Sequence, residues 1–177
     1  MPAVPLVARA ALHHWEEPPI SGRKGAGTVF FSGCSLGCVF CQNEAISQRD
    51  FGVPVSVSRL RALFWELIEQ GAHNIDLVNP THFAHAIVEA LKEPLPVPVV
   101  WNSGGYDKVE TLRMLEGKVD VYLPDLKYVT PALAGRYSAA SDYPMVAQAA
   151  ILEMVRQTGP CIVENGLLKR GVVVRHL

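Results

Sequence analysis

The sequence has no surplus of charge of either sign and no long apolar run. Lys and Arg number 16 against 17 Asp and Glu, so the formal net charge is −1. Nucleic-acid-binding proteins normally carry a basic surplus, and we therefore expect no nucleic-acid partner. No apolar run approaches the ~20 residues that a membrane-spanning helix needs, so we expect no membrane association either.

The N-terminus has no pattern typical of a secretion signal. Residues 1–11 are mildly apolar, but they include two prolines, and Arg9 is the one charged side chain among them. A signal peptide has a charged segment followed by an unbroken apolar stretch. We therefore expect a cytoplasmic protein.

Cysteine is scarce, and its distribution is uneven. Three of the four cysteines, Cys34, Cys38 and Cys41, fall within eight residues, whereas Cys161 is far away in an apolar segment. So few cysteines do not make a disulfide scaffold, and in a reducing compartment such a cluster indicates metal binding or catalysis. We expect Cys161 to be a free cysteine without a role, since buried free cysteines are common.

The composition is that of a globular protein with a sizeable core. Hydrophobic residues make up 49% of the 177 residues and charged residues 19%, which suits one folded domain. We find no internal repeat and no low-complexity tract. We expect residues 1–22 to form an N-terminal extension that packs on the core, and residues 23–177 to form the core itself.

Apolar strand-like segments alternate with amphipathic helical ones. Such alternation predicts parallel βα units, and hence an α/β barrel or a doubly wound sheet. Thr81 is expected to cap the second helix. No loop and helix follow the last strand, so we expect the chain to be truncated after its fifth core strand. The predicted strands are 28–32, 74–78, 98–101, 119–123, 161–163 and 171–177, and the predicted helices are 59–70, 81–91, 108–116, 131–138 and 144–157.

The cysteine cluster has the spacing C-x3-C-x2-C directly after the first predicted strand. Three thiolates in one tight loop can hold three irons of a [4Fe–4S] cube and leave the fourth iron open to another ligand. Gly33 and Gly37 supply the backbone freedom that such a loop needs. The alternatives are a zinc site or three incidental thiols. Structural zinc usually takes two well-separated pairs of ligands, and no second pair lies nearby.

This motif is similar to the signature of the radical S-adenosylmethionine (SAM) superfamily, and the wider sequence resembles pyruvate formate-lyase activating enzymes. The resemblance covers nearly the whole chain from about His13, and the cysteine motif is its most specific part. The segments that carry it are 14–18, 20–22, 27–43, 79–82, 101–106, 122–128 and 175–177.

The resemblance implies a fold, two cofactors and a reaction. The fold is a partial (βα) barrel of the radical SAM type, with a [4Fe–4S] cluster on Cys34, Cys38 and Cys41 and with SAM at the carboxyl ends of the strands. In the family, SAM chelates the open iron and is cleaved reductively to methionine and a 5′-deoxyadenosyl radical. The implied partners are a reductant such as flavodoxin or ferredoxin and, for an activating enzyme, a glycyl-radical enzyme.

Four polar residues follow neighbouring strands and are expected to converge above the cluster. Asn102 and Ser103 follow the third predicted strand, and Asp125 and Lys127 follow the fourth. Position alone favours loop capping and an ordinary surface lysine. By resemblance, activating enzymes use matching positions to bind SAM, with Lys127 on a carboxylate and Asp125 on an ammonium group, a hydroxyl or a monovalent cation.

Further SAM contacts are expected from less regular positions. Many family members carry Gly-Gly-Glu after the second strand, whereas residues 78–82 here read VNPTH; the SAM amino group must then be met by the backbone, Asn79 or Thr81. Asn43 either reaches SAM or caps the helix that follows. Arg175 and His176 alternate along the last strand, so that one of them faces the interior and can meet the adenosine. We take His176 as the candidate.

Other polar residues are expected to have no part in the site. Trp15, Glu16 and Glu17 precede every predicted core strand, so we expect them to cover the bottom or edge of the barrel. His82 and His85 lie one helical turn apart, but no acidic partner completes a metal site there.

Three functions remain open on the sequence. The first is a radical SAM activating enzyme for a glycyl-radical partner, and the second is a radical SAM enzyme that acts on a small molecule. The third is a non-catalytic iron–sulfur or zinc module.

Overall fold

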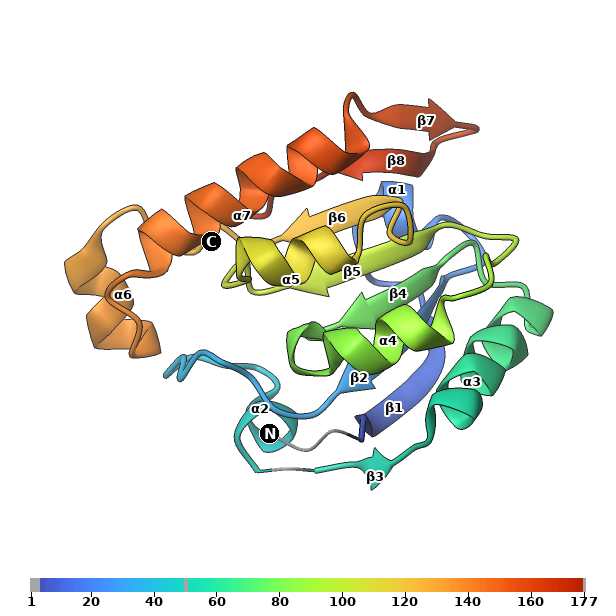
Figure 1. The fold of residues 1–177 in the computed structure, drawn as a ribbon, viewed down its shortest axis with the longest axis horizontal. Helices are drawn as coiled ribbons and strands as arrows, with labels where there is room; N and C mark the ends of the chain where they lie inside the picture. The colour runs from blue at the N-terminus through green and yellow to red at the C-terminus, as the bar shows by residue number, and fades with distance from the viewer. Residues whose placement is uncertain (1–3, 50, 177) are drawn as a thin grey trace.

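The computed structural model describes residues 4–49 and 51–176. Within these residues the chain is an α/β unit built on one eight-stranded mixed sheet, in the order β3-β1-β2-β4-β5-β6-β8-β7. The sheet is twisted and open, and helices pack along it (Figure 1). The predicted α/β class and its parallel βα units are therefore confirmed.

Five neighbouring strands of the sheet run parallel. Their register aligns Thr28 with Asp76, Val100 and Val121 across four of them. Most of their residues are buried, as expected for parallel strands that are covered on both faces. All five carboxyl ends lie along one edge of the sheet. These strands are β2 (Ala26–Phe31), β4 (Ile75–Val78), β5 (Val99–Ser103), β6 (Val121–Pro124) and β8 (Leu167–Val172).

Antiparallel strands flank this parallel group on both sides. β1 (Leu6–His13) pairs with β2, and the two-residue β3 (Val53–Pro54) pairs with β1. β7 (Ile162–Glu164) pairs with β8. The turn between β7 and β8 is Asn165-Gly166, and both residues have positive φ, 52° and 78°. This is the sequence and geometry of a type I′ hairpin turn.

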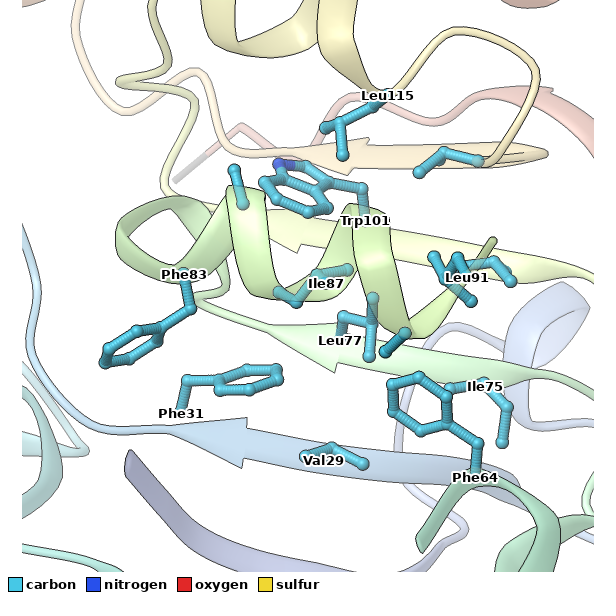
Figure 2. Packing of buried hydrophobic residues seen from close by; sticks show 14 of the residues in the cluster. Val29, Phe31, Phe64, Ile75, Leu77, Phe83, Ile87, Leu91, Trp101 and Leu115 are labelled. Atoms are coloured by element: carbon cyan, nitrogen blue, oxygen red, sulfur yellow. The ribbon is translucent and has the colours of Figure 1, made fainter. Parts of the chain in front are cut away.

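One face of the sheet carries the main helices and the largest core cluster (Figure 1). Figure 2 shows Ile87 of α4 packing toward Leu77 and Trp101 of the sheet, while Phe64 of α3 lies beside Ile75. The helices on this face are α3 (Val57–Glu69), the 3-10 turn η1 (Thr81–Phe83) with α4 (Ala84–Ala90), α5 (Val109–Met114) and α7 (Tyr143–Thr158).

The opposite face of the sheet is apolar at its base and polar toward the strand ends. Ile20 of the short helix α1 (Pro18–Ser21) packs on this face against Val100, Val121 and Leu123. Asp76 lies in register with Val100, and Asn102 lies two residues further along β5, in register with Val78. A polar surface therefore leads toward the carboxyl edge of the sheet.

Two small helices, α2 (Glu44–Gln48) and α6 (Pro131–Ser138), lie at that carboxyl edge. Figure 1 shows both of them beyond the arrowheads of the parallel strands, with the loop that follows β2 running between them. The predicted cysteine loop is therefore at the carboxyl edge.

Several details differ from the sequence predictions. β1 and β3 were not predicted, and the N-terminal segment, which was expected to pack on the core, contributes β1 to the sheet itself. β8 starts at Leu167 and ends at Val172 instead of running from 171 to 177, because the hairpin turn returns the chain directly into the sheet. Leu177 lies outside the described residues. No helix among the described residues is long and apolar enough to cross a membrane.

Candidate cofactor site

A cavity of about 660 Å³ opens at the carboxyl edge of the parallel strands. Its volume falls within the ~300–1,000 Å³ typical of small-molecule sites. Residues from the loops after β2, β4, β5 and β6 line it, together with residues 15–17 and Arg175. Every predicted site residue except Thr81 and His176 is among them: Cys34, Cys38, Cys41, Asn43, Asn79, Asn102, Ser103, Asp125 and Lys127.

The cysteine loop leaves β2 through Gly33, whose φ of +87° favours glycine. The backbone N–H of Gly33 donates to Ile46 O at 3.0 Å, which ties the loop to α2. All three cysteines are free and half-buried. Burial raises the pKa of the Cys34 thiol, and the nearby thiols of Cys38 and Cys41 add to this rise. The three sulfurs are thus close enough to act on one another.

The end of α6 holds the middle of the same loop. Gly37 donates its backbone N–H to Ser138 O at 3.0 Å, and Val39 donates to Tyr137 O at 2.9 Å. Cys38 Sγ lies 2.9 Å from Ser138 Oγ. The loop is therefore fixed by a helix about 100 residues further along the chain.

The arrangement of the thiols bears on which metal group fits. No three His, Cys, Asp or Glu side chains in residues 4–49 and 51–176 converge closely enough to hold a single metal ion. Cys34, Cys38 and Cys41 instead border a shared space. A [4Fe–4S] cube carries its irons at separate corners, so three thiolates around a space suit it. The set of three cysteine ligands therefore fits a [4Fe–4S] cluster.

The fourth cysteine lies apart from this site. Cys161 is exposed and lies at the β7–β8 hairpin, with Sγ 3.6 Å from Val172 O.

Charged groups from the strand ends form a network on the wall of the cavity. Lys127 Nζ lies 2.5 Å from Asp125 Oδ2, and Arg175 Nε lies 2.8 Å from Asp125 Oδ1. Arg175 also donates through Nη2 to Asn102 Oδ1 at 2.7 Å. The structure thus brings Asn102, Asp125 and Lys127 together as predicted. It pairs Lys127 with Asp125, however, so that a SAM carboxylate would have to share this lysine.

The hydroxyl groups of Thr81 and Ser103 bind a buried carboxylate. Thr81 Oγ1 donates to Asp107 Oδ1 at 2.6 Å, and Ser103 Oγ donates to Asp107 Oδ2 at 2.5 Å. Burial raises the pKa of Asp107, while these hydrogen bonds oppose the rise. Asp107 therefore links the loops after β4 and β5. The predicted cap is wrong, because Thr81 is the first residue of η1 and its hydroxyl is engaged with Asp107.

Asn79 and Asn43 occupy special backbone positions beside the cysteine loop. Asn79 has a φ of +56°, and its side-chain amide donates to Gly33 O, so that it joins the loop after β4 to the start of the cysteine loop. Asn43 precedes α2 but makes no side-chain capping bond, and it lines the cavity. Of the two roles expected for Asn43, the geometry does not support helix capping. It leaves the side chain available to a ligand in the cavity.

The last described residues resolve which side chain faces the interior. Arg175 forms a bridge with Asp125 and lines the cavity. His176 is exposed, and its Nδ1 lies 2.6 Å from Leu126 O. Because successive residues of an extended chain point to opposite sides, placing Arg175 inside directs His176 outward. The choice of His176 is therefore not supported by the geometry.

Sequence reasoning missed the acidic residues of the N-terminal segment. Glu16 and Glu17 line the cavity, with side-chain oxygens 3.6 and 3.8 Å from nitrogens of Arg175. Trp15 also borders the cavity, with 88% of its surface exposed. The signal that could have found them was the presence of HWEEP among the segments that carry the family resemblance.

Asp76 is a second residue that the sequence reasoning passed over. It is fully buried in β4 and accepts hydrogen bonds from Thr28 Oγ1 at 3.3 Å and from Asn102 Nδ2 at 3.5 Å. Burial, and secondarily the charge of Glu16, hold its pKa well above the usual range. An aspartate is rarely fully buried unless it has a partner. The position of Asp76 inside an apolar predicted strand was therefore the signal in the sequence.

Tyr143 at the start of α7 joins two of the loops at the cavity. Its hydroxyl lies 2.9 Å from Gly104 O and 2.8 Å from Asp125 O, and it accepts the backbone N–H of Lys127 at 2.9 Å. The side chain is fully buried. Tyr143 therefore holds the positions of Gly104, Asp125 and Lys127 relative to one another.

Comparison with known proteins adds one relative. The chain is 34% identical over 126 residues to the uncharacterized protein MJ0674 of Methanocaldococcus jannaschii. The aligned region makes up 66% of this chain and spans 37% of the length of that curated protein. No protein-family model matches the chain.

Proposed function

We propose that this chain is a radical SAM enzyme resembling pyruvate formate-lyase activating enzymes, with a partial (βα) barrel and a [4Fe–4S] cluster on Cys34, Cys38 and Cys41. One observation carries the proposal. Three free thiols with C-x3-C-x2-C spacing line the same cavity as the polar residues at the ends of three parallel strands. Sites of α/β barrels lie at this end of their strands.

The proposed chemistry divides between the cofactors and the chain. The cluster and SAM together supply one-electron cleavage of a sulfur–carbon bond of SAM, which yields methionine and a 5′-deoxyadenosyl radical able to abstract a hydrogen atom. The chain positions both groups and limits the access of water. Gly33 and Asn79 set the start of the cysteine loop, and the end of α6 holds its middle.

The residues of the cavity wall are proposed to bind SAM. Asn79 and Asn43 lie beside the thiols, where they can meet the amino acid part of SAM. Asp125 lies between Lys127 and Arg175, so its carboxylate is held in one place and can accept a hydrogen bond from a hydroxyl or ammonium group. Asn102 completes this wall through its bond to Arg175.

The activating role and the partners rest on the family resemblance. We propose flavodoxin or ferredoxin as the reductant and a glycyl-radical enzyme as the substrate. Conversion of a small molecule is the competing possibility, and both share the cluster and SAM. Incubation with SAM, dithionite and a candidate glycyl-radical enzyme separates them, because only an activating enzyme produces a glycyl radical signal in the partner.

Iron and sulfide analysis tests the central claim. Chain purified without air should hold about four irons and four sulfides, and Cys38→Ser should lose them. Cys161→Ser is the matched control and should retain them, since Cys161 is remote from the cavity in the hairpin. One zinc per chain with no sulfide would show that the proposal is wrong. In a chain that does hold the cluster, SAM should change the electron paramagnetic resonance spectrum of the reduced cluster, because SAM binds an iron directly.

A further inference from the structure

The bond between the cysteine loop and α6 continues into a second hydroxyl group. Cys38 Sγ lies 2.9 Å from Ser138 Oγ, and Ser138 Oγ lies 2.8 Å from the Tyr128 hydroxyl. The sulfur and the two hydroxyls therefore form one continuous chain. We propose that Ser138 and Tyr128 raise the reduction potential of the cluster that Cys38 binds. This inference rests on the proposed function, which supplies the cluster.

Iron binding fixes the direction of both hydrogen bonds. A cysteine bound to iron is a thiolate and has no hydrogen, so the Ser138 hydroxyl must donate to Cys38 Sγ. Ser138 has no second hydrogen, so the Tyr128 hydroxyl donates to Ser138 Oγ. Both O–H dipoles then point toward the sulfur, and each hydrogen bond of such a chain polarises and strengthens the other.

A donor at the sulfur acts more strongly on the reduced cluster than on the oxidised one. Reduction adds one negative charge, and hydrogen bonds to the sulfurs are among the factors that set the potential of iron–sulfur clusters. The Ser138 hydroxyl therefore stabilises the reduced form. A one-electron carrier of the flavodoxin or ferredoxin class can then reduce the cluster more readily.

The surroundings of the two hydroxyls keep water from replacing them. Ser138 is fully buried and Tyr128 is 9% exposed. Tyr128 packs edge-on against Tyr143, and Cys38 packs against the same apolar cluster, which includes Leu36. In such surroundings a hydrogen bond is stronger than in water, and a lost bond is not remade by solvent.

The backbone places the Ser138 hydroxyl in a fixed position. Ser138 is the last residue of α6, and Ala139 after it adopts the left-handed conformation, with a φ of +56°. The carbonyl of Ser138 accepts the N–H of Gly37 at 3.0 Å. Because this bond uses only the backbone, replacing the side chain of Ser138 should leave the loop in place.

Cys41 offers a weaker version of the same contact. Cys41 Sγ lies 3.3 Å from Ser47 Oγ, which also lies 3.4 Å from Glu44 O. This distance is longer than the one at Cys38, and the hydroxyl is shared with a carbonyl. We therefore assign the main effect on the potential to Ser138.

The test is a redox titration of the cluster-loaded chain without SAM, with dithionite as reductant and the reduced cluster followed by electron paramagnetic resonance. Ser138→Ala should lower the equilibrium constant for reduction of the cluster about tenfold, which is a shift of about 59 mV to more negative potential for one electron. Tyr128→Phe should shift it in the same direction by less. Ser141→Ala, an exposed serine three residues beyond Ser138, is the control and should show no shift.

Iron and sulfide content, measured first, separates the outcomes. An unchanged potential in Ser138→Ala at full iron content overturns the inference and leaves the proposed function intact. If Ser138→Ala does not retain iron, Tyr128→Phe decides, since it keeps Ser138: a negative shift supports the inference and no shift overturns it. An unsubstituted chain that holds no cluster overturns the proposed function and this inference with it.

Discussion

Asp125 lies between the two basic residues of the cavity wall. Its two oxygens contact Lys127 at 2.5 Å and Arg175 at 2.8 Å, and its backbone carbonyl lies 2.8 Å from the hydroxyl of Tyr143. A carboxylate held in this way needs little reorganisation to accept a ligand. The cysteine loop makes none of these contacts, so binding of SAM and binding of iron should be separable.

Asp125→Ala should weaken SAM binding about tenfold to a hundredfold, since a hydrogen bond to a charged group contributes about 1.5–3 kcal/mol. Its iron content should stay unchanged. Asp142→Ala is the control, because Asp142 is an exposed aspartate outside the cavity lining. Titration of the loaded chain with SAM, followed by electron paramagnetic resonance, gives the affinity. Loss of iron together with SAM affinity would show that Asp125 has a structural role instead.

Asp76 makes the stability of the protein depend on pH. Its folded pKa is well above the usual range because of burial, whereas the unfolded value is about 3.9. Between these values the folded state holds more protons than the unfolded state, so the free energy of unfolding falls as pH rises. Glu16, whose pKa is also raised by burial, acts with the same sign.

Asp76→Asn should remove much of this dependence. The Asn side-chain oxygen can still accept from Thr28 and Asn102, and it carries no charge at any pH. Urea unfolding at pH 5 and pH 8 gives the free energy of unfolding of the variant minus that of the original chain. This difference should increase from pH 5 to pH 8, because only the original chain loses stability as Asp76 loses its proton. Glu69→Gln, on the exposed side of α3, should leave the pH dependence unaltered. A constant difference across this range would show that Asp76 does not titrate as inferred.

At the scale of the elements, α3 is the clearest case of a helix whose start is set by local chemistry. Ser56 precedes it with extended backbone angles and accepts the N–H of Arg59 at 3.1 Å. The buried residues Leu60, Phe64 and Leu67 then follow at helical spacing on the side that faces the sheet. The amphipathic spacing is visible in the sequence, which explains why this helix is predicted within two residues.

Ser56→Ala should lower the free energy of unfolding by about 1 kcal/mol, because one N–H at the start of α3 loses its acceptor. Thr130→Ala offers a matched comparison. Thr130 occupies the same position before α6 but makes no side-chain capping bond. Thr130→Ala should therefore lower the free energy of unfolding by less than Ser56→Ala does. Urea unfolding of both variants measures the difference. Equal losses would show that the Ser56 bond contributes nothing beyond the propensity of the residue.

At the scale of the whole molecule, α1 helps to anchor on the sheet the N-terminal segment, whose strand β1 pairs with β2. Ile20 is fully buried among residues of β2, β5, β6 and β8, on the face opposite the main helices. Glu16 and Glu17, directly before α1, reach the cavity on the same side. Ile20 therefore covers the base of this face of the sheet, and its burial positions Glu16 and Glu17 at the cavity.

Ile20→Ala should lower the free energy of unfolding by about 2–5 kcal/mol, as is typical when a buried isoleucine is truncated. Leu152→Ala is the control, since Leu152 of α7 is 70% exposed, and it should change the stability by less than about 0.5 kcal/mol. Thermal or urea unfolding gives both values. A loss at Ile20 no larger than that at Leu152 would mean that α1 is not anchored on the sheet.

What the sequence determined by itself was local. Apolar runs bounded by turns predicted the strands β2, β4, β5 and β6 to within two residues, because hydrophobic periodicity acts over a few residues. The spacing of Cys34, Cys38 and Cys41 defined the candidate ligands in the same way. The order of strands and helices further predicted that the loops after β5 and β6 would meet at one edge.

The tertiary structure alone decided which distant residues meet. β1 has a mildly apolar and weakly alternating sequence, and it is a strand because β2 offers it an edge to pair with. Arg175 faces the cavity because its backbone pairs with Asp125, and Ser138 reaches Cys38 because α6 folds back over the cysteine loop. Contacts between residues so far apart depend on how the elements pack, and no pattern within a short stretch of sequence encodes them.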